Sequence, residues 1–148
     1  MANYFTDEET TCKCGCGFNK PDPRLLATMN EIREACKSAV DTTSVCRCQR
    51  NNARAGGVVA VKIYKPGTKT LDLNKYPRGV RGGQGDSNHT HGTAADIKCR
   101  KIGVDALWKL IKKMKTEGRL PYLAGLGRYD TFVHVDIAPV VPGRLREW

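Results

Sequence analysis

The stretch DTFVHVDI, residues 130–137, is the most informative for the fold, because its residues alternate with a period of two. Such alternation predicts a β-strand whose two faces differ. One face is aliphatic and suits a protein core. The other face carries Asp130, Phe132, His134 and Asp136. Two carboxylates and an imidazole on one face indicate the wall of a functional site rather than a plain core strand.

Two amphipathic helices are predicted upstream of this strand. Apolar residues recur every three or four positions over 23–38, and the preceding Asp22 suits a helix cap. The same period returns over 103–117, where Gly118 suits the position after a helix. Strands are predicted at 58–64 and 93–99, with a β-branched run at 42–46 and a further short strand at 70–73. This order predicts an α+β fold with a small, mainly antiparallel sheet and two principal helices.

The size and charge of the chain limit the classes of function that it can have. Its 148 residues suit one domain, so a two-domain enzyme is excluded, and no apolar run is long enough for a membrane helix. The net charge of +10 favours an anionic partner, which could be nucleic acid, anionic lipid or a cell-wall polymer. A basic protein without any charged partner is the simpler alternative. Glycine, proline and lysine are concentrated in a basic excursion at 65–86, where little regular structure is expected.

The seven cysteines are clustered rather than evenly spread. Three occur in CKCGCG at 12–17, two occur in CRC at 46–48, and Cys36 and Cys99 stand alone. In a reducing compartment such clusters are more often thiols or metal ligands than disulfides. The C-x-C spacing differs from the C-x-x-C of common zinc knuckles. Both a structural zinc and free thiols therefore remain open.

The chain has only three histidines, and two of them lie close to an aspartate. His89 and His91 precede Asp96, and His134 lies on the carboxylate-bearing strand. Two histidines and one carboxylate with an open position suit a catalytic zinc, and the same set suits non-haem iron. The alternative is that these side chains never meet in the fold.

Two motifs resemble the zinc D-Ala-D-Ala carboxypeptidase family. Residues 87–96 fit S-x-H-x-x-G-x-A-x-D, and they are followed by FVHVD at 132–136. That family has the hedgehog-like peptidase fold and includes many bacteriophage endolysins. Weaker similarities occur in the same order, at 5–17, 44–57 and 125–129. The chain departs from the family in three places: SVCR replaces S-G-Y-R at 44–47, residues 58–86 form a basic insertion, and Thr131 and Phe132 stand where relatives place an acidic residue or a histidine.

The resemblance implies a role for each matching residue. His89, Asp96 and His134 would bind one Zn²⁺, whose water would attack a peptide carbonyl, while His91 would not be a ligand. Asp130 is the preferred catalytic base, because it lies at the start of the strand, just after a glycine turn, and Asp136 is the alternative or a residue that orients a ligand. Arg47 would bind a carboxylate of the substrate. Ser87 would form a hydrogen bond with the substrate or, alternatively, stabilise the loop that carries the ligands.

The implied function is a zinc-dependent peptidoglycan peptidase, a D-Ala-D-Ala carboxypeptidase or an endopeptidase, in one domain spanning 1–148. Its substrates would be stem or cross-bridge peptides, and anionic wall polymer would attract the basic surface. A monomeric phage endolysin is expected, made without a signal peptide in the host cytoplasm and acting on the cell wall after release. The alternatives are a basic, Cys-rich nucleic-acid-binding module and an inactive zinc-binding module. Nucleic acid is the less favoured partner, because the basic segment lacks interleaved aromatic residues and zinc-finger spacing.

Overall fold

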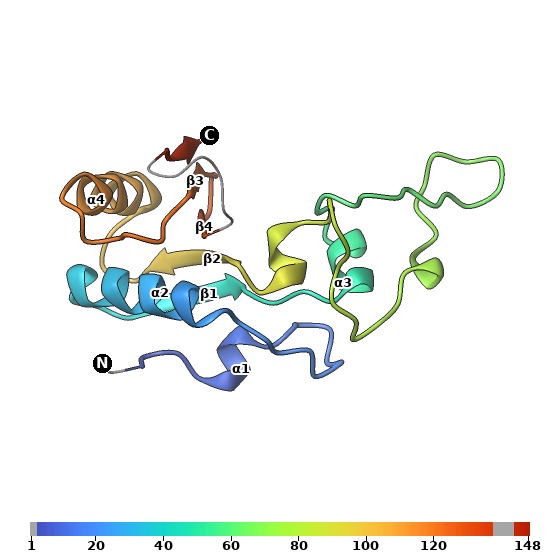
Figure 1. Ribbon diagram of the computed structural model, residues 1–148, viewed down its shortest axis with the longest axis horizontal. Helices are drawn as coiled ribbons and strands as arrows, with labels where there is room; N and C mark the ends of the chain where they lie inside the picture. The colour runs from blue at the N-terminus through green and yellow to red at the C-terminus, as the bar shows by residue number, and fades with distance from the viewer. Residues whose placement is uncertain (1–2, 138–143) are drawn as a thin grey trace.

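The computed structural model describes residues 3–137 and 144–148, which form one five-stranded sheet with helices beside it (Figure 1). The strands lie in the order β1-β2-β4-β3-β5. All neighbouring pairs are antiparallel except β3 and β5, which run parallel. The predicted α+β class with a mainly antiparallel sheet is therefore confirmed. The strands are β1 (Val40–Ser44), β2 (Ala94–Cys99), β3 (Gly125–Arg128), β4 (Val133–Asp136) and β5 (Arg146–Glu147).

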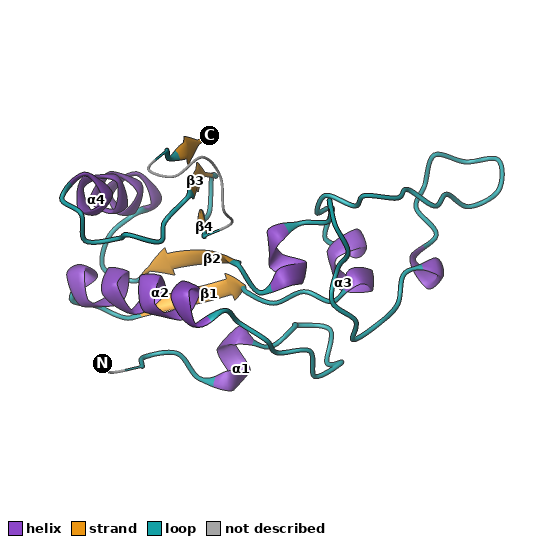
Figure 2. Ribbon diagram, in the orientation of Figure 1, coloured by secondary structure: helices purple, strands orange, loops and turns teal. Residues whose placement is uncertain are grey.

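Two principal helices, α2 (Pro23–Cys36) and α4 (Val104–Thr116), confirm the periodicity of the sequence. Asp22 caps α2 by accepting a hydrogen bond from the backbone amide of Arg24 at 2.8 Å. Beyond α4 the chain turns at Gly118, whose φ of 76° is in the left-handed region that glycine adopts without strain. The short helices are α1 (Asp7–Thr10), α3 (Gln49–Arg54), η1 (Leu73–Lys75) and η2 (Asn88–His91), as Figure 2 shows by colour.

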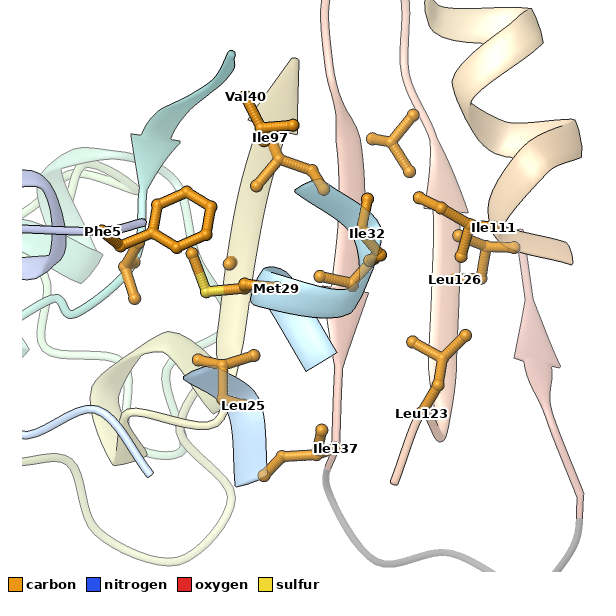
Figure 3. Packing of buried hydrophobic residues seen from close by; sticks show 14 of the residues in the cluster. Phe5, Leu25, Met29, Ile32, Val40, Ile97, Ile111, Leu123, Leu126 and Ile137 are labelled. Atoms are coloured by element: carbon orange, nitrogen blue, oxygen red, sulfur yellow. The ribbon is translucent and has the colours of Figure 1, made fainter. Parts of the chain in front are cut away.

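The core lies between the two principal helices and the aliphatic face of the sheet. Side chains of both helices gather with strand residues in one cluster (Figure 3). Its fully buried members include Leu25, Met29, Ile32, Leu107, Ile111, Leu126, Ile97, Val133 and Val135. Burying each large aliphatic side chain contributes about 1.5–3 kcal/mol relative to exposing it. The opposite face of the central strands is left to polar side chains, because β-strand residues alternate between faces.

The strands predicted at 58–64 and 70–73 are not present. The structure has only an isolated bridge between Tyr64 and Leu71, followed by η1. Val58 and Val61, which made the segment resemble a strand, are 67% and 68% exposed. Instead, a small satellite cluster forms around Tyr76, whose hydroxyl donates to the Val61 carbonyl at 2.8 Å. The expectation of a basic excursion with little regular structure is confirmed, because residues 65–86 contain only η1 and one bridge. The excursion extends away from the sheet (Figure 1).

Candidate metal centre

The polar face of the sheet brings three of the predicted residues together. Asp96 on β2 and His134 on β4 are direct partners across the antiparallel ladder. His89 reaches them from η2, the 3₁₀ turn that leads into β2. Gly92 ends this turn with a φ of 70°, and a Cβ there would lie 2.0 Å from the Lys20 carbonyl oxygen. Only glycine fits this position, and the tight turn sets how closely His89 approaches the sheet.

The potential ligand atoms of the three side chains converge on one point. His89 Nε2 lies 3.2 Å from Asp96 Oδ2, and His134 Nδ1 lies 3.0 Å from Asp96 Oδ1. All the ligand atoms of the cluster lie within 4.8 Å of one another. His89 and Asp96 are almost fully buried, at 3% and 4% exposure. Such spacing matches three protein ligands around a single metal ion.

The far nitrogen of each imidazole is held by a hydrogen-bond acceptor. His89 Nδ1 lies 2.8 Å from the Val45 carbonyl oxygen, so this nitrogen carries the proton and Nε2 presents a lone pair. His134 Nε2 lies 2.9 Å from Asp136 Oδ2, which leaves Nδ1 facing Asp96. Outer acceptors of this kind fix the tautomer and ring orientation of metal-binding histidines. The donor set therefore fits a metal ion at the Nε2 of one ring and the Nδ1 of the other.

The electrostatics of the cluster favour the metal-binding protonation states of His89 and Asp96, but they favour the protonated form of His134. Burial lowers the pKa of His89, so its ring is neutral near pH 7. Burial alone would raise the pKa of Asp96, but hydrogen bonds from His134 and His89 outweigh it and lower the pKa, so the carboxylate is ionised. Burial would lower the pKa of His134, but hydrogen bonds to Asp136 and Asp96 outweigh it and raise the pKa. A cation at the centre of the cluster would displace the proton on His134.

The cluster lies in the wall of a cleft of about 460 Å³. Arg47 lines this cleft, with its Nη2 atom 3.2 Å from Asp96 Oδ2 and its Nε atom donating to Ser44 Oγ at 2.9 Å. Ser87 also lines the cleft, but its hydroxyl caps η2 by accepting from the His89 amide at 3.3 Å. This contact supports the interpretation in which Ser87 stabilises the ligand loop. His91 is on the same turn but is not part of the cluster found in the described residues.

Asp130 is not brought to the cluster, contrary to the expectation that it stands over the open metal position. Strand β4 begins at Val133, so Asp130 does not alternate with His134 and instead belongs to the turn of the β3–β4 hairpin. A hydrogen bond from the Tyr129 amide to the Phe132 carbonyl at 3.0 Å closes that turn. Asp130 is exposed and lines a separate cavity with Asp105 and Arg128. Gly125 and Gly127 are paired with β4 in the sheet and do not form a flexible turn.

Asp136 is the carboxylate that contacts the cluster. It is fully buried, its Oδ2 atom accepts from His134 Nε2, and its Oδ1 atom pairs with Arg146. Gly125 is its partner across the β3–β4 ladder, where a Cβ would approach Asp136 Oδ2 to 2.3 Å. With both oxygens occupied, Asp136 is placed to orient His134 rather than to accept a proton from the cleft.

The sequence placed Phe132 on the wall of the site but did not identify the rest of the aromatic side of the cleft. Tyr129 and Phe132 stack with ring centroids 4.6 Å apart, and Trp148 lies 5.2 Å from the His134 ring. Trp148 Nε1 donates to the Tyr129 hydroxyl at 2.7 Å, which joins the two parts of the wall. Trp148 and Arg146 reach the cleft because β5 pairs with β3, a contact that no local sequence pattern signals.

Comparison with protein families gives one match. Residues 67–136, just under half of the chain, match the family model described as Peptidase M15, and this segment contains His89, Asp96 and His134. It does not contain Arg47. A search of curated proteins and a search of solved structures returned no match. The match agrees with the family that the motifs at 87–96 and 132–136 indicated: residues 67–136 are similar to the M15 family of zinc D-Ala-D-Ala carboxypeptidase-like, metal-dependent peptidases.

Proposed function

We propose that this protein is a zinc-dependent peptidase that cleaves peptide bonds in bacterial peptidoglycan. The observation that carries the proposal is the His89, Asp96 and His134 cluster, in which both imidazoles have their far nitrogens held by acceptors. Three protein ligands beside an open cleft are the arrangement of catalytic zinc sites, whereas structural sites enclose the ion with four. An open position favours a working enzyme over an inactive zinc-binding module.

The chain's own residues would hold the ion and orient the substrate. His89 Nε2, the Asp96 carboxylate and His134 Nδ1 would be the zinc ligands, and Asp136 would fix the His134 ring. A zinc ion bound there supplies a Lewis acid and lowers the pKa of its water to about 7. Arg47 would bind a substrate carboxylate, because its planar guanidinium lines the cleft beside the cluster and is positioned by Ser44 and Asp96.

If Arg47 binds a carboxylate, the favoured substrates are peptides whose C-terminal carboxylate lies close to the scissile bond, as in a stem that ends in D-Ala-D-Ala. Cross-bridge peptides with a free carboxylate meet the same requirement. Tyr129, Phe132 and Trp148 also line the cleft and form an aromatic wall, against which small side chains of the peptide would pack. The substrate class is thus a short, carboxylate-bearing wall peptide.

The basic insertion at 58–86, which contains the basic excursion, would bring the enzyme to its polymer. Its cationic side chains are exposed, and the segment begins and ends at the cleft rim with Val58 and Asp86. The exposed cations are Lys62, Lys65, Lys69, Lys75, Arg78 and Arg81. Because Gram-positive walls carry anionic polymers, we propose that this segment supports wall binding in a phage endolysin, which would be made in the host cytoplasm and would reach the wall on release. No helix among the described residues is long and apolar enough to cross a membrane.

Hydrolysis of purified cell walls tests the proposal. The protein should clear walls in a gel or in suspension, lose this activity on chelation, and regain it on addition of zinc. His134→Ala should abolish both zinc binding in the cleft and wall hydrolysis, because it removes one of three ligands. His91→Ala is the matched control, since His91 lies outside the cluster, and it should retain both. Full hydrolysis by metal-free protein would contradict the proposal, and a zinc-loaded protein without hydrolysis would favour an inactive module.

A further inference from the structure

A second cluster of potential metal ligands lies outside the cleft and is formed by cysteines. The four sulfur atoms of Cys12, Cys14, Cys16 and Cys48 lie within 4.8 Å of one another. Cys12 Sγ and Cys14 Sγ are 3.5 Å apart, and Cys14 Sγ and Cys48 Sγ are 3.7 Å apart. All four are free thiols, and these separations far exceed the roughly 2.05 Å of a disulfide bond.

The sulfur separations match those of a tetrahedral tetrathiolate site. With a zinc–sulfur distance of about 2.3 Å, tetrahedral geometry places neighbouring sulfur atoms about 3.8 Å apart. We propose that Cys12, Cys14, Cys16 and Cys48 bind one structural zinc ion, distinct from the ion of the cleft. Four protein ligands leave no open position, so this ion would not take part in catalysis.

The loop that carries three of the cysteines is shaped to aim them at one point. Gly15 and Gly17 have φ values of 81° and 83°, in the left-handed region that residues with a Cβ avoid. Gly15 separates Cys14 from Cys16, and Gly17 follows Cys16, so the chain turns on both sides of this third cysteine. The loop is closed by a hydrogen bond from the Cys12 amide to the Phe18 carbonyl at 2.8 Å.

Backbone amides already point at the sulfur atoms. The Cys48 amide donates to Cys12 Sγ at 3.4 Å, and the Asn51 amide donates to Cys48 Sγ at 3.4 Å. The Phe18 amide lies 3.5 Å from Cys16 Sγ. Hydrogen bonds to sulfur stabilise the anionic thiolates that bind metal ions, and outer contacts of this kind hold ligands in place.

A cationic side chain of the basic excursion lies beside the cysteine cluster and would partly neutralise the charge of such a site. Four thiolates around Zn²⁺ carry a net charge of −2, which a nearby cation would stabilise. Arg78 Nη2 donates to the Cys14 carbonyl at 2.9 Å and so holds its guanidinium beside the cluster. The remaining cysteines of the chain, Cys36, Cys46 and Cys99, are buried and are not part of the cluster found among the described residues.

Metal analysis of a variant that lacks the cleft ligands separates the two sites. The double variant His89→Ala/His134→Ala, expressed and purified under reducing conditions, should retain about one zinc per chain. Replacing that zinc with Co²⁺ should produce a near-ultraviolet sulfur-to-cobalt charge-transfer band, which a site of nitrogen and oxygen ligands does not give. Absence of both the zinc and the band in this variant would overturn the inference without affecting the proposed peptidase.

Cysteine variants in the same background provide the second measurement. Cys14→Ser should remove the remaining zinc and the cobalt band, whereas Cys36→Ser should keep both, because Cys36 lies outside the cluster. If Cys14→Ser fails to fold, the double variant with intact cysteines still decides the question. Retention of the metal by Cys14→Ser would contradict the site, and iron in place of zinc in the protein as purified would contradict the metal assignment.

Discussion

Replacing Asp136 with asparagine should weaken metal binding in the cleft, whereas the same change at Asp130 should not. Asp136 is fully buried and accepts the hydrogen bond of His134 Nε2 at 2.9 Å. Asparagine keeps the shape of the side chain but loses its charge, so the His134 ring is held less firmly with Nδ1 toward the metal. Asp130 is exposed in the hairpin turn and faces a different cavity.

The size of the effect is limited by the contribution of the charged hydrogen bond, which the substitution weakens. A hydrogen bond to a charged group contributes about 1.5–3 kcal/mol, and each 1.4 kcal/mol is a factor of ten in affinity. The zinc dissociation constant of Asp136→Asn should therefore rise by roughly 10–100-fold, which is also the usual range for outer contacts of metal ligands. Wall hydrolysis should be reduced at limiting zinc and should recover partly at high zinc.

Competition with a chelating dye measures the affinity, and wall clearing at several zinc concentrations measures activity. Arg146→Met is the control for loss of the neighbouring charge, because it leaves the bond between Asp136 and His134 intact. Asp130→Asn should match the parent in zinc affinity and activity, with unfolding free energy within about 0.5 kcal/mol. The reasoning would be refuted if Asp130→Asn kept its zinc but lost hydrolysis, because Asp130 would then be the proton acceptor of the reaction.

Three further predictions concern the ligand turn, a helix cap and the basic insertion. Gly92→Ala should lower the unfolding free energy by about 3 kcal/mol and the Tm by roughly 6–12 °C in a thermal scan, because a Cβ would clash with the Lys20 carbonyl and the backbone is left-handed; an unchanged Tm would contradict this. Asp22→Ala should cost about 1 kcal/mol at pH 7. The hydrogen bonds that Arg24 donates lower the folded pKa of Asp22, so this contribution is present above the unfolded pKa of about 3.9 and is lost as the pH falls through the folded pKa. Denaturant titrations of both proteins from pH 7 to 2 should show the difference shrinking, and a constant difference would exclude the charge as its source. Neutralising Lys62, Lys65 and Lys69 of the basic insertion to glutamine should weaken wall binding and flatten its salt dependence, with hydrolysis of a small soluble peptide unchanged; equal loss on both substrates would show that the insertion shapes the cleft.

The sequence predicted the elements whose pattern is local. The periodicity of α2 and α4 followed from residues that face the core, and the cap at Asp22 set where α2 begins. Alternation around His134 predicted which of its neighbours share a face, and the structure has Val133 and Val135 buried in the core. The spacing of His89 and Asp96 left open whether they meet His134. Their meeting depends on the register between β2 and β4, which pairs Asp96 with His134.

The sequence could not predict features that depend on a distant partner. Alternation marks the faces of a strand but not its length, so Asp130 was assigned to a strand that in fact begins three residues later. Residues 58–64 have the composition of a strand, but no neighbouring strand in the described part of the chain pairs with them beyond the bridge at Tyr64. Trp148 enters the cleft only because β5 pairs with β3.

The short segment from Val45 to Cys48 links the cleft to the cysteine cluster. The Val45 carbonyl accepts from His89 Nδ1, and the Arg47 side chain pairs with Asp96. Cys48 follows directly and contributes its sulfur to the second cluster, while the Arg47 amide donates to the His89 carbonyl at 3.0 Å. An ion held by the four sulfur atoms would therefore fix the end of the segment that orients His89 and Arg47. Only three residues, Val45 to Arg47, precede Cys48 in this segment. A metal ion that holds Cys48 in place would therefore also hold His89 and Arg47, and it would stabilise the cleft without contacting substrate.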